Sequence, residues 1–173
     1  MGTPRCGAEI VRSRAISRIG KTDMDETDRK ILKNLQLDGR LTVADLSERI
    51  ALSATPCARR LKRLEDTGVI TGYRAMIDRE LVQLGITVFV GVSLDQHNAG
   101  VVEHFEAEIN AMPEIISCYV VSGEYDYLLE VVSPDILSHE HFLRELLVRA
   151  KVKSLHSCFA MRTVKTGATL PIE

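Results

Sequence analysis

The sequence has no run of apolar residues that approaches the ~18 needed to span a membrane, and its first residues lack the apolar block of a secretory signal. Its four cysteines, Cys6, Cys57, Cys118 and Cys158, are far apart and form no CxxC pair. Isolated reduced thiols are typical of cytosolic proteins, although the spacing leaves a pair of distant cysteines open. We therefore expect a cytoplasmic protein with no membrane partner.

Signatures of catalysis and metal binding are also missing. The sequence contains no GxSxG, P-loop or GxGxxG motif. Its five histidines form no metal motif, because even His139 and His141 are two positions apart on an expected helix and point in different directions. We predict no catalytic residue, no metal and no cofactor. An enzyme acting on small molecules is the least favoured function.

The charge of the chain is nearly balanced. With 173 residues, 45% of them hydrophobic, and a net charge of −2, the composition is that of a soluble protein of one or two domains. A protein of this charge that binds a polyanion must gather its cations on one surface. Residues 1–23 are one basic region, which we interpret as a disordered tail. There are two alternatives. These residues could form an arm that contacts DNA, or Met24 could be the natural first residue, with the preceding residues coming from a start codon assigned too far upstream.

Residues 24–73 have the pattern of three short helices. Asp28, Ile31, Leu32 and Leu35 recur at helical spacing before a stop at Asp38-Gly39. Thr42, with Asp45 three residues later, predicts a capping box at the start of the second helix. Ser53 is a cap for the third helix, which we expect to end near Thr67 with Gly68 as its terminator. Residues 69–73 should be extended.

The third helix has two different faces. At ~100° per residue, Cys57, Leu61 and Leu64 share one side and should pack on the other helices. Burial there favours core packing of Cys57 over a redox role. The opposite side carries polar and basic residues, with Arg60 on its flank: Thr55, Arg59, Lys62 and Arg63. A short cationic helix after a tight turn is suited to the major groove of double-stranded DNA, so we predict a helix-turn-helix at residues 43–62. Taken alone, the basic face would also fit an ordinary solvated helix.

After a connector at residues 74–85 the apolar period changes to two. Residues 86–94 alternate strictly and predict a strand. The remaining pattern predicts a helix from Asn98 to Pro113, strands at 115–122 and 125–132, a helix after Pro134 and a strand at 152–164. On the last helix, the expected buried residues are Leu137, Phe142, Leu146 and Leu147. The order β-α-β-β-α-β predicts a ferredoxin-like α+β domain over residues 86–173, with an antiparallel sheet covered by two helices on one face.

The turn between the two middle strands has features of a small-molecule site. Gly123 permits a positive φ and leaves nearby N–H groups uncovered, and Asp126 can pair with an ammonium group. Backbone donors beside a carboxylate would suit a free amino acid. By itself the pattern favours an ordinary hairpin turn in which Asp126 is solvated or paired with an arginine.

Two stretches carry a resemblance to a known family. The segment LSERIALSATPCARRLKRLEDTGVITGY, with its TPC triplet and its R-x-x-R-L-E tail, resembles the Lrp/AsnC family of leucine-responsive and asparagine-operon regulators. VVSGEYDYLLEV is similar to the family's SG-x-x-D-Y segment. The resemblance runs from Asp25 nearly to the C-terminus and leaves out residues 1–23.

The resemblance implies a (winged) helix-turn-helix domain followed by an effector-binding domain. In the family, the SG-x-x-D-Y segment lines a small-molecule pocket where dimers meet, and the usual effector is an amino acid. Carried over to this sequence, the pocket would contain Ser122, Gly123, Glu124, Tyr125 and Asp126, with Met161 and Thr163 as weaker additions. The resemblance also implies homodimers formed through the sheets, and often octamers.

Together these features predict a bacterial or archaeal transcription regulator that binds specific DNA sequences and responds to an amino-acid-type effector. Paired helix-turn-helix units of a dimer would contact half-sites ~34 Å apart. The alternative is an architectural protein that wraps DNA with little effector response.

Overall fold

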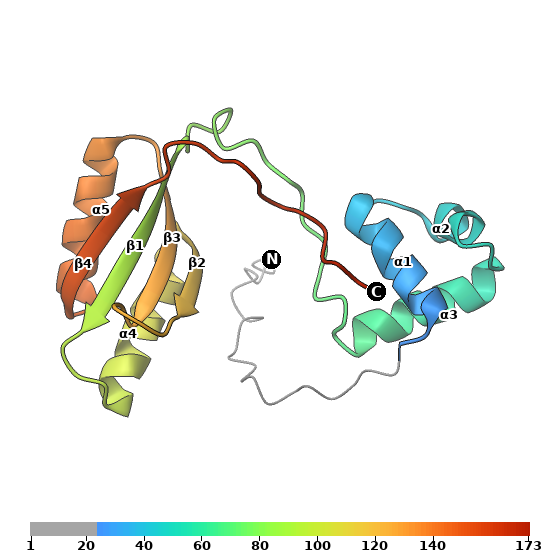
Figure 1. Ribbon diagram of the computed structural model, residues 1–173, viewed down its shortest axis with the longest axis horizontal. Coiled ribbons are helices and arrows are strands. Elements are labelled where there is room, and N and C mark those ends of the chain that lie inside the picture. Colours follow the sequence, from blue (N-terminus) through green and yellow to red (C-terminus); the bar gives the residue numbers. More distant parts are fainter. Residues whose placement is uncertain (1–23) are drawn as a thin grey trace, which may run out of the picture. The chain divides into compact units, whose positions relative to one another are not determined.

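The computed structural model describes residues 24–173, so the predicted basic tail at residues 1–23 lies outside the described residues. The described chain divides into two compact units (Figure 1). The helical unit contains the residues up to Met76 together with Lys165–Glu173, and the α+β unit contains Ile77–Val164. No helix in residues 24–173 is long and apolar enough to cross a membrane.

The helical unit consists of α1 (Glu26–Leu37), α2 (Val43–Arg49) and α3 (Ala54–Asp66). The predicted capping box of α2 is confirmed, because the Thr42 hydroxyl accepts from the Asp45 N–H and the Asp45 carboxylate accepts from the Thr42 N–H, both at 3.2 Å. Ser53 is the N-cap residue of α3, but its side chain accepts no hydrogen bond from the helix. Gly68 follows α3 with a φ of 71°, as a C-terminal glycine should.

A single apolar cluster holds the three helices together, and its buried members are Ile31, Leu32, Leu46, Ile50, Cys57 and Leu64. The extended segment predicted at residues 69–73 pairs with no strand, and the described part of this unit contains no β-strand at all. Its chain is held back against α3 by the Ile70 N–H, which donates to the Leu64 carbonyl at 3.0 Å.

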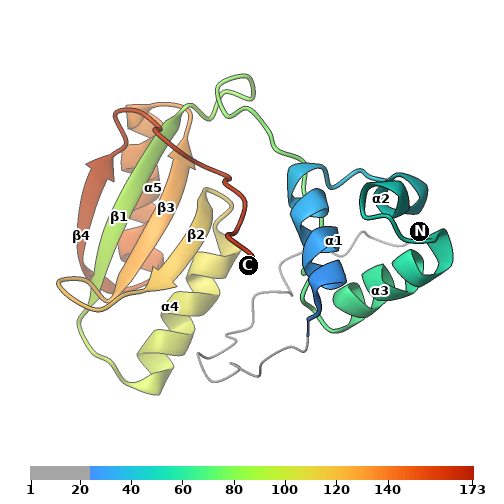
Figure 2. The ribbon, with the colours of Figure 1, turned by 45° about the vertical axis from the view of Figure 1, so that its right-hand side comes forward.

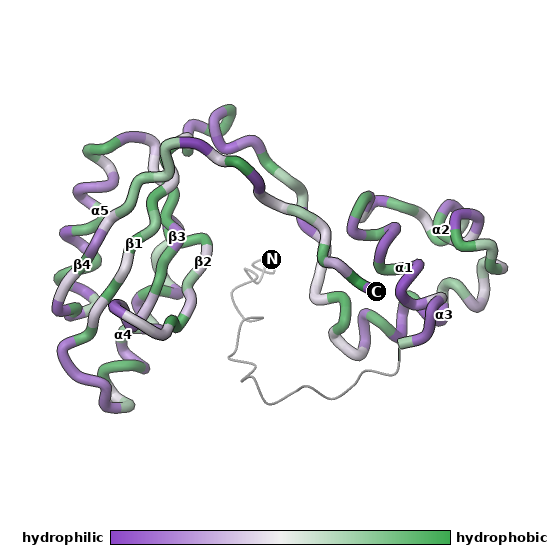
Figure 3. The backbone as a smooth tube through the Cα atoms, in the orientation of Figure 1, coloured by the Kyte–Doolittle hydropathy of each residue, from purple (hydrophilic) through white to green (hydrophobic). Residues whose placement is uncertain are grey.

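The end of the chain belongs to the helical unit, whereas the sequence pattern placed residues 86–173 together. Ile172 packs partly buried against the helical cluster. The side-chain amide of Gln36 on α1 binds both backbone polar groups of Leu170. Its Oε1 accepts from the Leu170 N–H, and its Nε2 donates to the Leu170 carbonyl. The chain close to its C-terminus includes hydrophobic positions (Figure 3), and burial of the apolar Ile172 side chain accounts for its attachment to the cluster.

The α+β unit has the predicted β-α-β-β-α-β order. Its elements are β1 (Ile86–Leu94), α4 (Ala99–Ala111), β2 (Ile115–Val120), β3 (Tyr127–Ser133), α5 (Ile136–Arg149) and β4 (Val152–Phe159). The strands form one sheet in the order β2-β3-β1-β4, with every neighbouring pair antiparallel. Helices α4 and α5 cover one face of this sheet (Figure 2), so the predicted ferredoxin-like arrangement is confirmed.

The core of this unit lies between the sheet and its helices. Val88, Val90 and Val92 point inward from β1 and are fully buried, as their alternation predicts. They pack with Phe105 of α4 and Leu146 of α5. Two strand boundaries differ from the prediction. β4 ends at Phe159, after seven residue pairs with β1, whereas the predicted strand continued to residue 164. The β2–β3 connection spans residues 121–126 and is longer than the predicted turn.

The buried stripe of α5 was predicted wrongly in two places. Leu137 and Leu147 are 63% and 43% exposed, whereas His139 is 2% exposed. Phe142 and Leu146 set the inward direction, and at ~100° per residue His139 shares it while Leu137 and Leu147 do not. The His139 ring lies against Phe142 and Phe159. Its Nε2 is 3.3 Å from the Ser157 hydroxyl, and its Nδ1 has no hydrogen-bond partner.

We predict that His139 makes the α+β unit less stable in mild acid. Burial lowers the pKa of His139. The unfolded chain, with a His pKa of ~6.5, therefore binds a proton before the folded chain does. Stability should thus fall as the pH drops below ~6.5, until the folded-state pKa is reached. The free energy of unfolding in urea at pH 7.5 and pH 5.5 measures this loss. His139→Leu should reduce it, and exposed His141→Leu should not; an equal loss in His139→Leu and the wild type would contradict the prediction.

We also predict that the C-terminal segment stabilises the helical unit. Ile172→Ala removes part of an apolar contact and should lower the free energy of unfolding of this unit by about 1 kcal/mol. Leu170 is 71% exposed, so Leu170→Ala is the matched control and should change it by less than about 0.5 kcal/mol. Hydrogen exchange at the α1 amides measures both changes. Equal protection of α1 in the wild type and Ile172→Ala would show that the segment contributes nothing.

Candidate nucleic-acid interface and small-molecule site

The position of α3 is set by a short turn after α2 and by two buried side chains. Ala51 has a φ of 53°, which reverses the chain, and the Leu52 N–H donates to the Ser47 carbonyl at 2.9 Å. Cys57 and Leu64 seat α3 on the apolar cluster. Burial raises the pKa of the Cys57 thiol, which keeps it protonated and disfavours the redox role that was the alternative.

The opposite side of α3 is exposed and cationic. Thr55, Arg59 and Lys62 all lie on this side and are exposed. Within residues 24–173, Arg59 and Lys62 form no ion pair. Two cations with no internal partner on a short rigid helix are what binding to phosphates and base edges requires.

The other two predicted cations, Arg60 and Arg63, bind acidic residues of α1. Arg60 Nη1 lies 3.0 Å from Asp28 Oδ1 and 2.6 Å from Asp25 Oδ2. Arg63 Nη2 pairs with the other oxygen of Asp28. Asp28 itself is fully buried, and its carboxylate also accepts the Asp25 N–H. Sequence reasoning missed these pairs, although an aspartate inside the apolar stripe of α1 was a visible signal.

Two groups of this cluster, Asp25 and Arg60, hold each other in their charged forms. The Asp28 N–H and then the Arg60 guanidinium lower the pKa of the Asp25 carboxyl. Asp25 and Asp28 in turn raise the pKa of Arg60. The ion pair between Asp25 and Arg60 is therefore maintained at neutral pH.

The predicted effector segment lies at the end of the sheet where β1 finishes. The Asp126 N–H donates to the Val92 carbonyl at 2.9 Å, and the Val121 N–H donates to the Asp126 carbonyl at 3.0 Å. These bonds close the connection over Ser122, Gly123, Glu124 and Tyr125. Gly123 has a φ of 127° and open space where a Cβ would stand, so the predicted positive φ is present and the turn is uncovered on that side.

Tyr125 lies flat on the outer face of the sheet. A Cβ added to Gly91 of β1 would come within 2.6 Å of the Tyr125 ring, so any larger residue there would displace the ring. The ring centroids of Tyr125 and His156 on β4 are 5.4 Å apart. The aromatic side chain therefore leads away from the turn and across the face that the helices leave uncovered.

Asp126 already has two partners inside the chain. Its Oδ2 accepts the Leu94 N–H at 2.7 Å, and its Oδ1 is 2.8 Å from Nε2 of His97. These two contacts, that of the Leu94 N–H first, lower the pKa of Asp126 and keep it a carboxylate. No sequence signal pointed to His97. A ligand ammonium group would have to displace its ring or bind beside it.

Met161 and Thr163 are exposed and lie beyond the end of β4. β4 begins beside Leu94, near the 122–126 turn, and ends beside Val88 at the opposite end of the sheet. Met161 and Thr163 therefore follow the end of the sheet that is far from the turn. The structure brings Ser122–Asp126 together within one chain and leaves Met161 and Thr163 apart from them.

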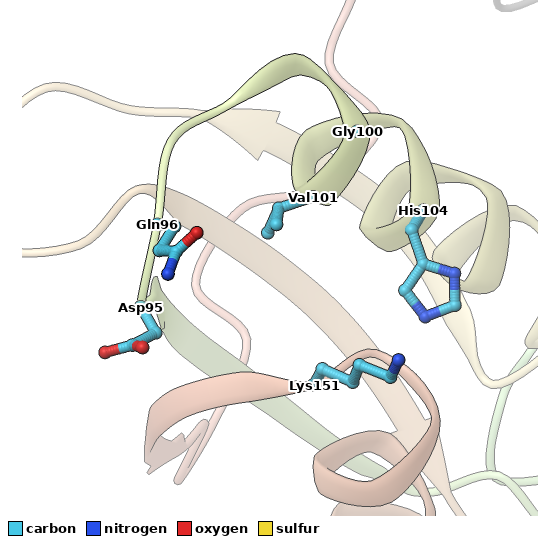
Figure 4. A pocket seen from close by; sticks show the side chains of 6 residues that line it. All are labelled: Asp95, Gln96, Gly100, Val101, His104 and Lys151. Carbon is cyan, nitrogen blue, oxygen red and sulfur yellow. The ribbon is translucent and has the colours of Figure 1, made fainter.

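A hollow of about 320 Å³ opens near the effector segment, between the β1–α4 loop and the α5–β4 turn. It is lined by Asp95, Gln96, Gly100, Val101, His104 and Lys151 (Figure 4). Lys151 extends toward His104, whose Nε2 is 2.8 Å from the Arg149 carbonyl oxygen. No group of three or more potential metal ligands occurs in residues 24–173.

Comparison with known proteins also divides the chain into two domains, although the second match includes residues 165–170, which belong to the helical unit in the structure. Residues 24–71 match the family model of a winged helix-turn-helix DNA-binding domain, and residues 87–170 match that of the Lrp/AsnC ligand binding domain. The leucine-responsive regulatory protein of Salmonella typhimurium is 39% identical over 157 residues, which are 90% of this chain and 95% of that protein.

Two solved structures are similar in fold and sequence. A transcriptional regulator of Neisseria meningitidis, solved as a complex with L-Met, is 41% identical with a TM-score of 0.81 over 86% of this chain and 96% of its own. An AsnC family transcriptional regulator of Agrobacterium tumefaciens is 38% identical with a TM-score of 0.82 over 86% of this chain and 97% of its own. By its two matched domains and these relatives, the chain belongs to the Lrp/AsnC family of DNA-binding transcriptional regulators, which are not enzymes.

Proposed function

We propose that this regulator binds discrete DNA sites through the exposed side of α3 and changes its occupancy of them when a free amino acid binds the α+β unit. The observation that carries the proposal is the pair of exposed cations Arg59 and Lys62, which have no ion-pair partner within residues 24–173. Since its DNA partner lies in the cytoplasm of a bacterial cell, we infer that the protein acts there.

In this proposal Thr55, Arg59 and Lys62 face the major groove. Arg60 and Arg63 flank them, and each guanidinium keeps N–H donors that its aspartate partners do not use. Two copies of the chain would present two such helices to successive turns of one face of the duplex.

We propose that these copies associate through the uncovered face of the sheet. Phe89 of β1 and Tyr119 of β2 are 39% and 57% exposed on that face, and large exposed side chains of this kind are typical of an interface. Dimers of dimers, up to an octamer, would bring a second copy to the 122–126 turn. Met161 and Thr163 would join such a pocket only from a neighbouring copy.

The proposed effector site consists of Ser122, Gly123, Glu124, Tyr125 and Asp126. Uncovered backbone beside Gly123 would receive the carboxylate of an amino acid, and the Asp126 carboxylate would receive its ammonium group. Support comes from the similar Neisseria meningitidis regulator, whose structure contains L-Met.

The DNA-binding face predicts the effects of two substitutions. Arg59→Ala and Lys62→Ala should each weaken operator binding by roughly 1–3 kcal/mol, and Lys62→Ala should reduce the salt dependence of log Kd by about one unit. Lys33→Ala removes the same charge from an exposed position of α1 and should leave both quantities unchanged. Fluorescence anisotropy at several salt concentrations provides the measurement.

Footprinting on the same DNA separates this function from its alternative. A few discrete protected sites are expected, whereas extended and regularly phased protection would favour an architectural role. Wild-type affinity in both α3 variants would show that α3 is not the helix that contacts DNA.

The effector site predicts a selective thermal shift. At a hundredfold excess over its Kd, a bound amino acid should stabilise the protein by about 2.7 kcal/mol, and a screen of the twenty amino acids should reveal it as a raised Tm. Asp126→Asn should abolish the shift because the amide does not pair with an ammonium group. Asp95→Asn, a nearby exposed carboxylate, should retain it.

Sedimentation velocity with and without the active amino acid reports any change in the number of associated copies. If all twenty amino acids leave the wild-type Tm unchanged, the effector proposal fails. If Asp126→Asn still responds, the ligand binds elsewhere.

A further inference from the structure

The buried carboxylate of Asp28 connects the first helix of the DNA-binding unit with the helix proposed to contact DNA. Asp28 is fully buried within the apolar stripe of α1. A buried carboxylate needs compensating charge and hydrogen bonds, and both come from α3. Arg60 and Arg63 are 32 and 35 positions away in the sequence, so the contact depends on the tertiary fold.

The two arginines divide the oxygens of Asp28 between them. Arg60 binds Oδ1 at 3.0 Å, while Arg63 binds Oδ2, which also accepts the Asp25 N–H at 3.2 Å. Arg60 reaches in addition to Asp25, the N-cap of α1, at 2.6 Å. Asp28 therefore occupies the centre of a network that includes the capped end of α1 and one side of α3.

This network fixes the rotation of α3 about its own axis. Arg60 and Arg63 are three positions apart and form one stripe of the helix, directed at α1. Arg59 and Lys62 are also three positions apart, and each precedes its neighbour in that stripe by one residue. The second stripe is therefore turned by ~100° from the first, and it is the one left free.

We propose that Asp28 is a positioning residue for DNA recognition, which holds α3 through Arg60 and Arg63 so that Arg59 and Lys62 are directed at the DNA. The proposal rests on the proposed role of α3. It separates the five polar and basic residues of α3 into two groups: one that contacts DNA and one that acts chiefly through α1. It also explains why arginine stands at both holding positions, since a guanidinium can bind a carboxylate oxygen while retaining donors for a phosphate.

Asp28→Asn distinguishes positioning from simple charge masking, because the two roles predict opposite changes in the affinity for the preferred DNA sequence. If Asp28 only masked two cations, its neutralisation would release them, strengthen binding to all DNA and raise the salt dependence of log Kd by about one to two units. If Asp28 positions α3, binding to the preferred sequence should weaken about tenfold, the loss typical of a misplaced base contact, while binding to shuffled DNA stays within about twofold.

The measurement uses the full chain and two duplexes: one that the wild type enriches from a random pool, and a shuffled duplex of the same composition. Anisotropy titrations over a range of salt concentrations give the ratio of the Kd for the shuffled duplex to the Kd for the enriched duplex. They also give the salt dependence of each Kd. Glu26→Gln is the matched control, since it removes an acidic group of α1 whose one ion-pair partner within residues 24–173 is Lys30, and it should leave the ratio unchanged. Circular dichroism confirms that each variant is folded.

A second variant keeps the proposal testable if Asp28→Asn does not fold. Asp25→Asn retains an oxygen to cap α1 but loses the charge that binds Arg60. It should also lower this ratio, but by less than Asp28→Asn does. An unchanged ratio in the folded variant, whichever of the two is used, overturns the proposal. A wild type that enriches no sequence instead overturns the proposed function, so the two failures are distinguishable.

Discussion

The helical unit depends on a charge that the fold takes out of water. Asp28 stands where the apolar stripe of α1 meets α3, and its carboxylate is stable there only while two guanidinium groups reach it. The Arg60 and Arg63 side chains are 29% and 50% exposed, so water screens part of each ion pair, but the loss of either guanidinium would leave a buried carboxylate oxygen without its charged partner. Apolar packing of Ile31 and Leu64 holds the helices together, and the ion pairs restrict which way α3 faces.

In the α+β unit the corresponding constraint is steric. The outer face of β1 carries Gly91 beneath the Tyr125 ring, and any larger residue would displace it. The carboxylate of Asp126 then fastens the following turn to the end of β1 through the Leu94 N–H. The conformation of the proposed effector segment is therefore set by the sheet itself, before any ligand binds.

The parts of this structure that local periodicity determines were predictable from sequence. The strict alternation of residues 86–94 and the pairing of Thr42 with Asp45 both reflect contacts between near neighbours. The end of β4 depends on where its partner strand runs out, and the docking of Ile172 joins positions over a hundred residues from α1, so neither has a local signal. Helical phase correctly placed Arg59 and Lys62. It also placed Arg63 on the exposed side, but it gave no sign of the ion pair with Asp28, because a long side chain can end far from the direction in which it leaves the helix.

α1 is the element on which these long-range contacts converge. Its C-terminal half binds the end of the chain through Gln36, and its N-terminal turn binds α3 through Asp28. The α+β unit continues into the helical unit at both of its ends, through the connector after Tyr73 and through the segment after Val164. The second of these connections is attached to α1 through Gln36, and α1 is attached through Asp28 to the guanidinium groups of Arg60 and Arg63. One helix therefore anchors both the end of the chain and the ion pairs that hold α3, so the orientation of the DNA-binding helix and the attachment of the C-terminal segment depend on the same element.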